Sequence, residues 1–140
     1  MASNVTVKDI MTKDVKVVNN NTVVQEVVAI MNKYDKDAIL VVQSGKPTGI
    51  ITVKDVLIRA VEAGTPLKTI IARMVYTNPL VVIEENATVE EAAKLMKHWK
   101  IKHLPVVDKQ GALLGMINDR DVVYAVPALI PTMEEFCRKK

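Results

Sequence analysis

The sequence predicts an α/β fold (α+β) made of two copies of a small β-α-β-β-α unit. A heptad at Gly49–Asp55 recurs at Gly115–Asp121. Each copy begins with a glycine, continues with two large apolar residues and places an amide or hydroxyl side chain three positions before its aspartate. The apolar stretches Ala38–Val42 and His103–Val107 keep almost the same offset as the heptads. Because this offset is longer than the roughly 20–50 residues of solenoid repeats, we expect two units that share a core.

The first unit begins with a strand and a helix. Val15–Val18 is rich in β-branched residues and predicts a short strand. After a turn at Asn19–Asn21, Thr22 and Gln25 have the spacing of a capping box at the start of a helix. Apolar residues at helical spacing predict the buried face of this helix: Val23, Val27, Ile30, Met31 and Tyr34.

A strand pair and a second helix complete this unit. Ala38–Val42 is an apolar run of strand length, and Ser44–Pro47 has the composition of a turn. Gly49–Thr52 is therefore expected to form an adjacent antiparallel strand. A helix follows over Asp55–Ala63 and ends at Gly64.

The second unit repeats this plan after an ordered linker over residues 67–74. Leu80–Ile83 predicts a strand, and Thr88 with Glu91 predicts the capped start of a helix whose buried face contains Val89, Ala92, Ala93, Met96 and Trp99. Leu104–Val107 and Leu113–Asn118 predict the strand pair, and Asp121–Val126 begins the last helix. We thus expect a first repeat with its lead-in at 1–66, a second repeat with its linker at 67–126, and a tail at 127–140.

Composition excludes several classes of protein. Hydrophobic residues make up 49% of the chain but aromatic residues only 4%, so the core is expected to be aliphatic. A net charge of +3 is too small to indicate nucleic-acid binding by itself. The single cysteine, Cys137, excludes an intramolecular disulfide, and no Cys/His cluster indicates a metal site. Residues 1–7 lack the apolar core of a signal peptide, so we expect a soluble, cytoplasmic protein.

The repeated heptad allows a structural and a functional interpretation. Thr52 with Asp55 has the spacing of a capping box and Asn118 with Asp121 is nearly the same, so capping alone would be sufficient to explain both pairs. Three features favour a binding site. The glycine permits close approach to the backbone, the carboxylate can accept both hydroxyls of a ribose, and cationic residues recur near the second copy.

These motifs resemble a tandem pair of cystathionine-β-synthase (CBS) domains, the adenosine-ligand sensing unit called a Bateman module. The residues that carry the resemblance are Val7–Thr12, Gly49–Asp55, His103–Asp108 and Gly115–Asp121. It covers about Val5 to Val126. The resemblance implies two repeats packed with pseudo-twofold symmetry and two clefts between them.

By this resemblance, the aspartate of each heptad holds the ribose hydroxyls of an adenine nucleotide. The first cleft would be lined by Ile50, Thr52, Asp55, Ile71, Met74, Lys102, His103 and Arg120. The second, weaker cleft would be lined by Thr6, Met11, Asp37, Ala38, Lys54, Asn118 and Asp121. It departs from the family pattern because Asn118 replaces the usual Thr or Ser and Asp37 would repel a phosphate. We therefore expect the first cleft to bind more tightly.

The expected function is that of a non-catalytic regulatory module for energy sensing. It would bind AMP, ADP or ATP as its regulatory ligand, require no other cofactor, form a homodimer and act on an effector protein that the sequence does not identify. The sequence offers no activated nucleophile and no phosphate loop, which argues against an enzyme. Two alternatives stay open. In the first, the chain would be a structural dimerisation module with degenerate clefts. In the second, it would bind nucleic acid through the basic segment Lys94–His103 around Trp99.

Overall fold

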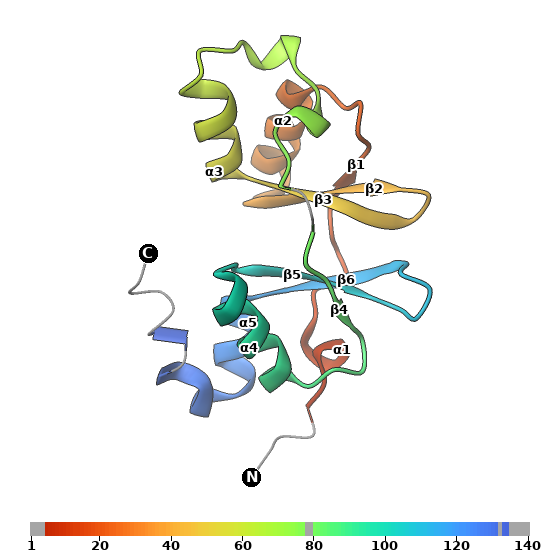
Figure 1. The fold of residues 1–140 in the computed structure, drawn as a ribbon, viewed down its shortest axis with the longest axis vertical. Coiled ribbons are helices and arrows are strands. Elements are labelled where there is room, and N and C mark those ends of the chain that lie inside the picture. The colour runs from red at the N-terminus through yellow and green to blue at the C-terminus, as the bar shows by residue number, and fades with distance from the viewer. Residues whose placement is uncertain (1–4, 78–79, 132, 135–140) are drawn as a thin grey trace. The chain divides into compact units, whose positions relative to one another are not determined.

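The computed structural model describes residues 5–77, 80–131 and 133–134, which form two compact units. One unit is Val15–Leu80, and the other combines Met1–Asp14 with Val81–Lys140. Each contains a three-stranded sheet, with order β1-β2-β3 in the first and β4-β5-β6 in the second (Figure 1). The mixed α/β class predicted from the repeat is confirmed. Cys137 lies outside the described residues.

In the unit Val15–Leu80, two helical segments lie on one face of the sheet (Figure 1). Its strands are β1 (Val17–Val18), β2 (Ala38–Gln43) and β3 (Lys46–Thr52), with β1 parallel and β3 antiparallel to β2. Its helices are α2 (Val24–Tyr34) and α3 (Val53–Val56), and α3 continues as a π-helix over Leu57–Val61. Two 3-10 turns follow, at Leu67–Thr69 and Ala72–Met74.

The start of α2 differs from the prediction. The helix begins at Val24 with Val23 as N-cap and no side-chain cap. Thr22 belongs instead to the preceding turn, because its hydroxyl oxygen accepts a hydrogen bond from the Asn19 backbone N–H at 3.2 Å. Its carbonyl accepts from Ala72 N–H at 2.8 Å. A threonine already bonded on the turn side cannot cap the helix that follows.

The core of this unit is aliphatic and joins α2 to the sheet. Val24, Val27 and Met31 are buried on one face of α2, against Ile39 and Ile51 of the sheet. Burying large aliphatic side chains stabilises the fold by about 1.5–3 kcal/mol each. Two further residues predicted for this face are exposed instead: Val23 and Tyr34.

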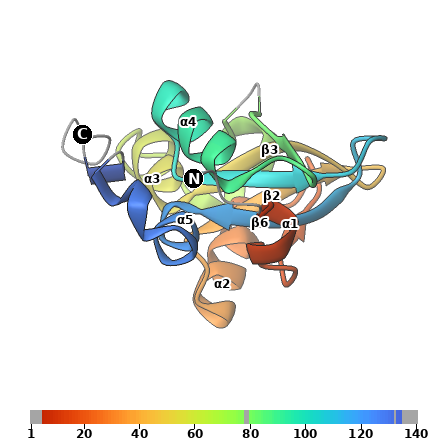
Figure 2. The same cartoon turned by 90° about the horizontal axis from the view of Figure 1, so that it is seen from below.

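The second unit repeats the architecture with the N-terminal segment included. It contains α1 (Val7–Ile10), β4 (Ile83–Glu84), α4 (Val89–Trp99), β5 (His103–Val107), β6 (Leu113–Asn118), α5 (Asp119–Ala125) and a 3-10 turn at Pro127–Leu129. The lead-in joins this unit through backbone hydrogen bonds from Val7 N–H to Ala87 O and from Val89 N–H to Val5 O. The short helix α1 contacts β6 and α5 (Figure 2).

The helix α4 shows one success and one failure of the periodicity argument. Thr88 caps the helix as predicted, since its hydroxyl oxygen accepts from Glu91 N–H at 3.1 Å. Val89, Ala92, Ala93 and Met96 are buried as predicted. Trp99 is 55% exposed, because it is the last helical residue and the chain turns away at the next position. Within the described part of the chain, no helix has the length and apolar character needed to cross a membrane.

Candidate functional site

The first heptad lies where β3 passes directly into α3. Thr52 has an extended backbone and caps the helix, and its hydroxyl oxygen accepts from Asp55 N–H at 3.2 Å. Asp55 Oδ2 in return accepts the Thr52 backbone N–H at 2.8 Å and the Thr52 hydroxyl at 3.0 Å. The capping box predicted from the spacing therefore forms, and it fixes the carboxylate at the junction of strand and helix.

The second oxygen of Asp55 faces two residues that sequence reasoning missed. Thr77 donates its hydroxyl to Asp55 Oδ1 at 3.3 Å, and Arg59 Nε lies 3.9 Å from the same oxygen. Thr77 reaches this place because its backbone N–H donates to Ile50 O at 2.8 Å. Arg59 also donates through Nη1 to Tyr76 O at 2.7 Å. The i,i+4 spacing of Asp55 and Arg59 was a usable signal for the ion pair, but nothing in the sequence pattern indicates Thr77.

Each heptad glycine allows another segment to pack directly on the backbone. A Cβ built on Gly49 would lie 2.7 Å from Tyr76 Cγ and 2.8 Å from Cε2. A Cβ built on Gly115 would lie 2.7 Å from Met11 Sδ. Met11 and Tyr76 thus occupy equivalent places in the two units.

The second heptad forms the same box with an amide in place of the hydroxyl. Asn118 N–H donates to Asp121 Oδ2 at 2.9 Å, and Asp121 N–H donates to Asn118 Oδ1 at 2.8 Å. A backbone bridge between Thr12 and Met116 places the lead-in beside this heptad. Among the residues that the structure describes, Asp121 Oδ1 has no hydrogen-bond partner. The carboxylate of the second box is therefore held through one oxygen only.

The apolar residues predicted for the first cleft lie in two places. Ile50 is buried on β3 and forms a backbone bridge with Thr77. Ile71 forms a bridge with Val23, at the start of α2. Met74 lies on the 3-10 turn Ala72–Met74 and is 56% exposed. Thr77, which is bonded to Asp55, thus connects Ile50 to the carboxylate. Ile71 instead lies next to the start of α2.

Thr6, predicted for the second cleft, forms a capping box that the sequence reading missed. Asp9 Oδ2 accepts the Thr6 backbone N–H at 3.0 Å and the Thr6 hydroxyl at 3.1 Å. These hydrogen bonds, the backbone one first, hold the pKa of Asp9 below its ordinary value. The signal was present in the sequence, because Thr6 and Asp9 have the same spacing as the heptad pairs.

The three predicted phosphate ligands of the first cleft lie close to the second heptad within their own unit. His103 is the first residue of β5 and pairs with Asn118 in the β-ladder. Lys102 is exposed, and its carbonyl accepts Asp119 N–H at 3.1 Å. Arg120 is exposed in the first turn of α5.

The corresponding residues of the other unit lie close to the first heptad. Ala38 pairs with Thr52 in the ladder between β2 and β3, and Asp37 O accepts Val53 N–H at 3.1 Å. Lys54 is exposed in the first turn of α3. Each unit therefore carries a heptad aspartate together with the residues that were predicted to serve the phosphate of the other cleft.

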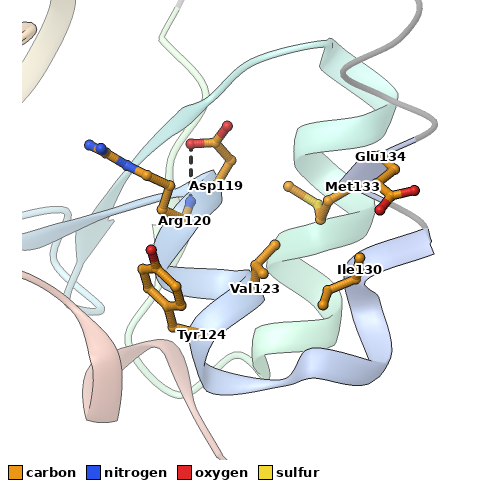
Figure 3. A pocket seen from close by; sticks show the side chains of 7 residues that line it. All are labelled: Asp119, Arg120, Val123, Tyr124, Ile130, Met133 and Glu134. Atoms are coloured by element: carbon orange, nitrogen blue, oxygen red, sulfur yellow. Dashed lines mark hydrogen bonds between the residues drawn. The ribbon is translucent and has the colours of Figure 1, made fainter.

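In the described residues, two pockets within the individual units have linings that include heptad residues but neither Asp55 nor Asp121. One of about 260 Å³ lies between α5 and the following segment (Figure 3) and is lined by Asp119, Arg120, Val123, Tyr124, Ile130, Met133 and Glu134. The other, of about 400 Å³, lies between α2 and α3 and is lined by Val28, Met31, Asn32, Asp35, Lys36, Val53, Val56, Leu57, Val61 and Leu67. In the described residues, no three His, Cys, Asp or Glu side chains cluster as metal ligands would.

The repeated geometry agrees with a family match over most of the chain. The model of the CBS domain matches twice, at residues 7–62 and 71–128. The chain belongs to the CBS-domain family. The two heptads described above fall within the two matched CBS domains, one in each.

Three similar proteins cover most of this chain. An uncharacterised protein of Methanopyrus kandleri is 32% identical over 136 residues, which cover 96% of this chain and 69% of that protein. A solved structure of a protein with CBS domains from Burkholderia ambifaria matches with a TM-score of 0.80 at 27% identity, over 88% of this chain and 94% of that one. The CBS domain pair of protein MJ0100, at 23% identity and TM-score 0.77, shares the fold over 90% of this chain and 98% of its own. MJ0100 was solved with 5′-methylthioadenosine and S-adenosyl-L-methionine.

Proposed function

We propose that this CBS-domain pair is a non-catalytic regulatory module that binds an adenine nucleotide, AMP, ADP or ATP. The observation that carries the proposal is the pair of aspartates, Asp55 and Asp121, each fixed at a strand-to-helix junction by a capping box. A carboxylate held in this way offers acceptor lone pairs for the hydroxyls of a ribose without the entropic cost of ordering a free side chain. The adenosine ligands of MJ0100 support the ligand class.

The phosphate end of the ligand distinguishes the two proposed sites. Asp55 would be served by Lys102, His103 and Arg120, whereas Asp121 would be served by Asp37, Ala38 and Lys54. The first set contains two permanently charged side chains, Lys102 and Arg120, and the imidazole of His103. The second combines one cation with one carboxylate, which opposes an anionic ligand. We therefore propose that nucleotides bind more tightly at Asp55.

A homodimer is the second part of the proposal. Large apolar side chains are exposed along α3 and the π-helix that continues it: Val53, Leu57, Ile58 and Val61, between 43% and 55% exposed. A contiguous apolar patch on a helix is typical of a surface that another protein covers. A second copy of the chain as the partner would let ligand occupancy be transmitted as a change in assembly, provided that the ligand has different affinities for two states.

Ligand-linked unfolding tests the binding proposal. A ligand present at 100 times its Kd raises the free energy of unfolding by about 2.7 kcal/mol, so AMP, ADP or ATP should raise the Tm in a concentration-dependent manner. Asp55→Asn keeps an oxygen for the capping N–H while it removes the charged acceptor, and it should abolish most of this shift. An equal shift in Asp55→Asn and the wild type would contradict the assignment of the ribose to Asp55.

The dimer is tested separately by Leu57→Lys. Leu57 is 52% exposed, so the substitution should leave the free energy of unfolding of a monomer nearly unchanged. We expect the mass in sedimentation equilibrium to fall from that of a dimer to that of one chain. A wild type that is already monomeric at the concentrations where it binds nucleotide would contradict the homodimer.

A further inference from the structure

We propose that Thr77 and Arg59 are positioning residues that fix the Asp55 carboxylate for a ribose hydroxyl, and that the second heptad lacks both. This inference rests on the proposed function. It assigns the difference between the two sites to the support behind each aspartate, in addition to the charges near the phosphate.

The two carboxylate oxygens of Asp55 have different hydrogen-bond partners. Oδ2 accepts both the backbone N–H and the hydroxyl of Thr52, so its acceptor capacity is used by the capping box. Among the described residues, Oδ1 accepts the Thr77 hydroxyl alone, at 3.3 Å, and retains a lone pair for another donor. The side chain of Asp55 is 14% exposed, so this oxygen is reached from one restricted direction.

Arg59 holds the segment that carries Thr77. Its Nη1 donates to Tyr76 O at 2.7 Å and, more weakly, to Val75 O at 3.5 Å. On the other side of this segment, Thr77 N–H donates to Ile50 O at 2.8 Å. The backbone around Thr77 is therefore fixed from the helix and from the strand. The guanidinium also places a positive charge 3.9 Å from Asp55 Oδ1, which favours one orientation of the carboxylate.

The second heptad has the same backbone geometry without these side-chain contacts. Thr12 N–H donates to Met116 O at 2.8 Å, as Thr77 N–H donates to the carbonyl of the equivalent strand residue. The Thr12 side chain is nevertheless exposed, and within the described chain it makes no hydrogen bond to Asp121. When the two heptads are aligned, Ala125 stands at the position of Arg59 and has no group that could hold the lead-in. In this part of the chain, Oδ1 of Asp121 thus lacks the two contacts that Asp55 Oδ1 has, and this carboxylate is held through Oδ2 alone.

The test is an AMP titration in an Asp121→Asn background, in which the site at Asp55 is observed alone. Thr77→Val keeps the shape of the side chain and removes the hydroxyl. We expect it to weaken AMP binding about threefold to tenfold, the effect of one hydrogen bond, and Thr77→Ser to restore it. Thr12→Val is the matched control at the equivalent position and should leave AMP binding in this background unchanged. Arg59→Met, like Thr77→Val, should lower the affinity for AMP.

A ligand without ribose hydroxyls separates positioning from a general loss of structure. In the parent, 2′,3′-dideoxy-AMP should bind more weakly than AMP, and Thr77→Val should hardly change its affinity. The AMP affinity divided by the 2′,3′-dideoxy-AMP affinity should therefore be smaller in Thr77→Val than in the parent. Equal losses for both ligands, or AMP binding as tight in Thr77→Val as in the parent, would overturn the assignment. If neither the Asp121→Asn parent nor the wild type binds AMP, ADP or ATP, the proposed function itself fails, and the inference fails with it.

Discussion

The packing of Tyr76 on Gly49 predicts a large cost for a single methyl group. In Gly49→Ala the new Cβ would lie 2.7 and 2.8 Å from Cγ and Cε2 of the Tyr76 ring and closest of all to Cδ2. The ring cannot move away freely, because Arg59 holds the Tyr76 carbonyl at 2.7 Å and the next residue is bonded to β3. Overpacking of this kind costs about 1–3 kcal/mol. We expect the free energy of unfolding to fall by that amount.

Urea unfolding followed by circular dichroism measures this effect. The midpoint should move to lower urea while the slope m stays the same, since the substitution does not change the surface exposed on unfolding. Gly64→Ala measures backbone strain without overpacking, because no atom lies within 4 Å of its added Cβ and only its left-handed backbone, φ +74, opposes the substitution, by about 1–2 kcal/mol. A Gly49→Ala protein as stable as the wild type would refute the close approach of Tyr76.

The remaining predictions concern two other capping residues. Thr88→Ala should lower the free energy of unfolding by about 1 kcal/mol in urea titrations, whereas Thr22→Ala should cost less because Thr22 caps no helix; equal losses would contradict the cap assignment. The folded-state pKa of Asp9 is depressed, so its contribution to stability is present above the ordinary value of 3.8 and is lost as the pH falls through the lowered value. Asp9→Asn should therefore show a shallower loss of stability in acid. An unchanged acid limb would contradict the Thr6–Asp9 box.

Features that depend on nearby residues could be predicted from the sequence. The boxes at Thr52 and Asn118 follow from the short spacing between each cap residue and its aspartate, and the structure confirms both. The strand pairs follow from apolar runs separated by turn residues. The groups of each box lie three positions apart, and the paired strand residues lie at most 15 positions apart across a turn, so local geometry determines how they meet.

The periodicity argument failed at the ends of helices. Tyr34 and Trp99 continue the apolar spacing of α2 and α4 but are exposed. Each is the last residue of its helix, and the following residue, Asp35 or Lys100, has a left-handed backbone that turns the chain away. The helical period predicts which face of a helix is apolar, but it does not show at which residue that face extends beyond the sheet and becomes exposed.

Three contacts between distant segments could not be predicted from spacing in the sequence. Thr77 meets Asp55 across 22 residues, and Arg59 meets Tyr76 across 17. The lead-in at Val7 joins the second unit through Ala87. None of these contacts leaves a spacing in the sequence, because the folded sheet brings the segments together. Thr77 was missed as a contact of Asp55 for this reason, whereas the i,i+4 spacing of Asp55 and Arg59 was a usable signal.

Isothermal titration of the wild type with AMP, ADP and ATP tests the central claim most directly, with Asp55→Asn and Asp121→Asn titrated in parallel. We predict saturable binding near one nucleotide per chain that is lost in Asp55→Asn and retained in Asp121→Asn. No detectable binding of any adenine nucleotide at millimolar concentration would contradict the claim and would leave the two boxes with a role in helix capping alone.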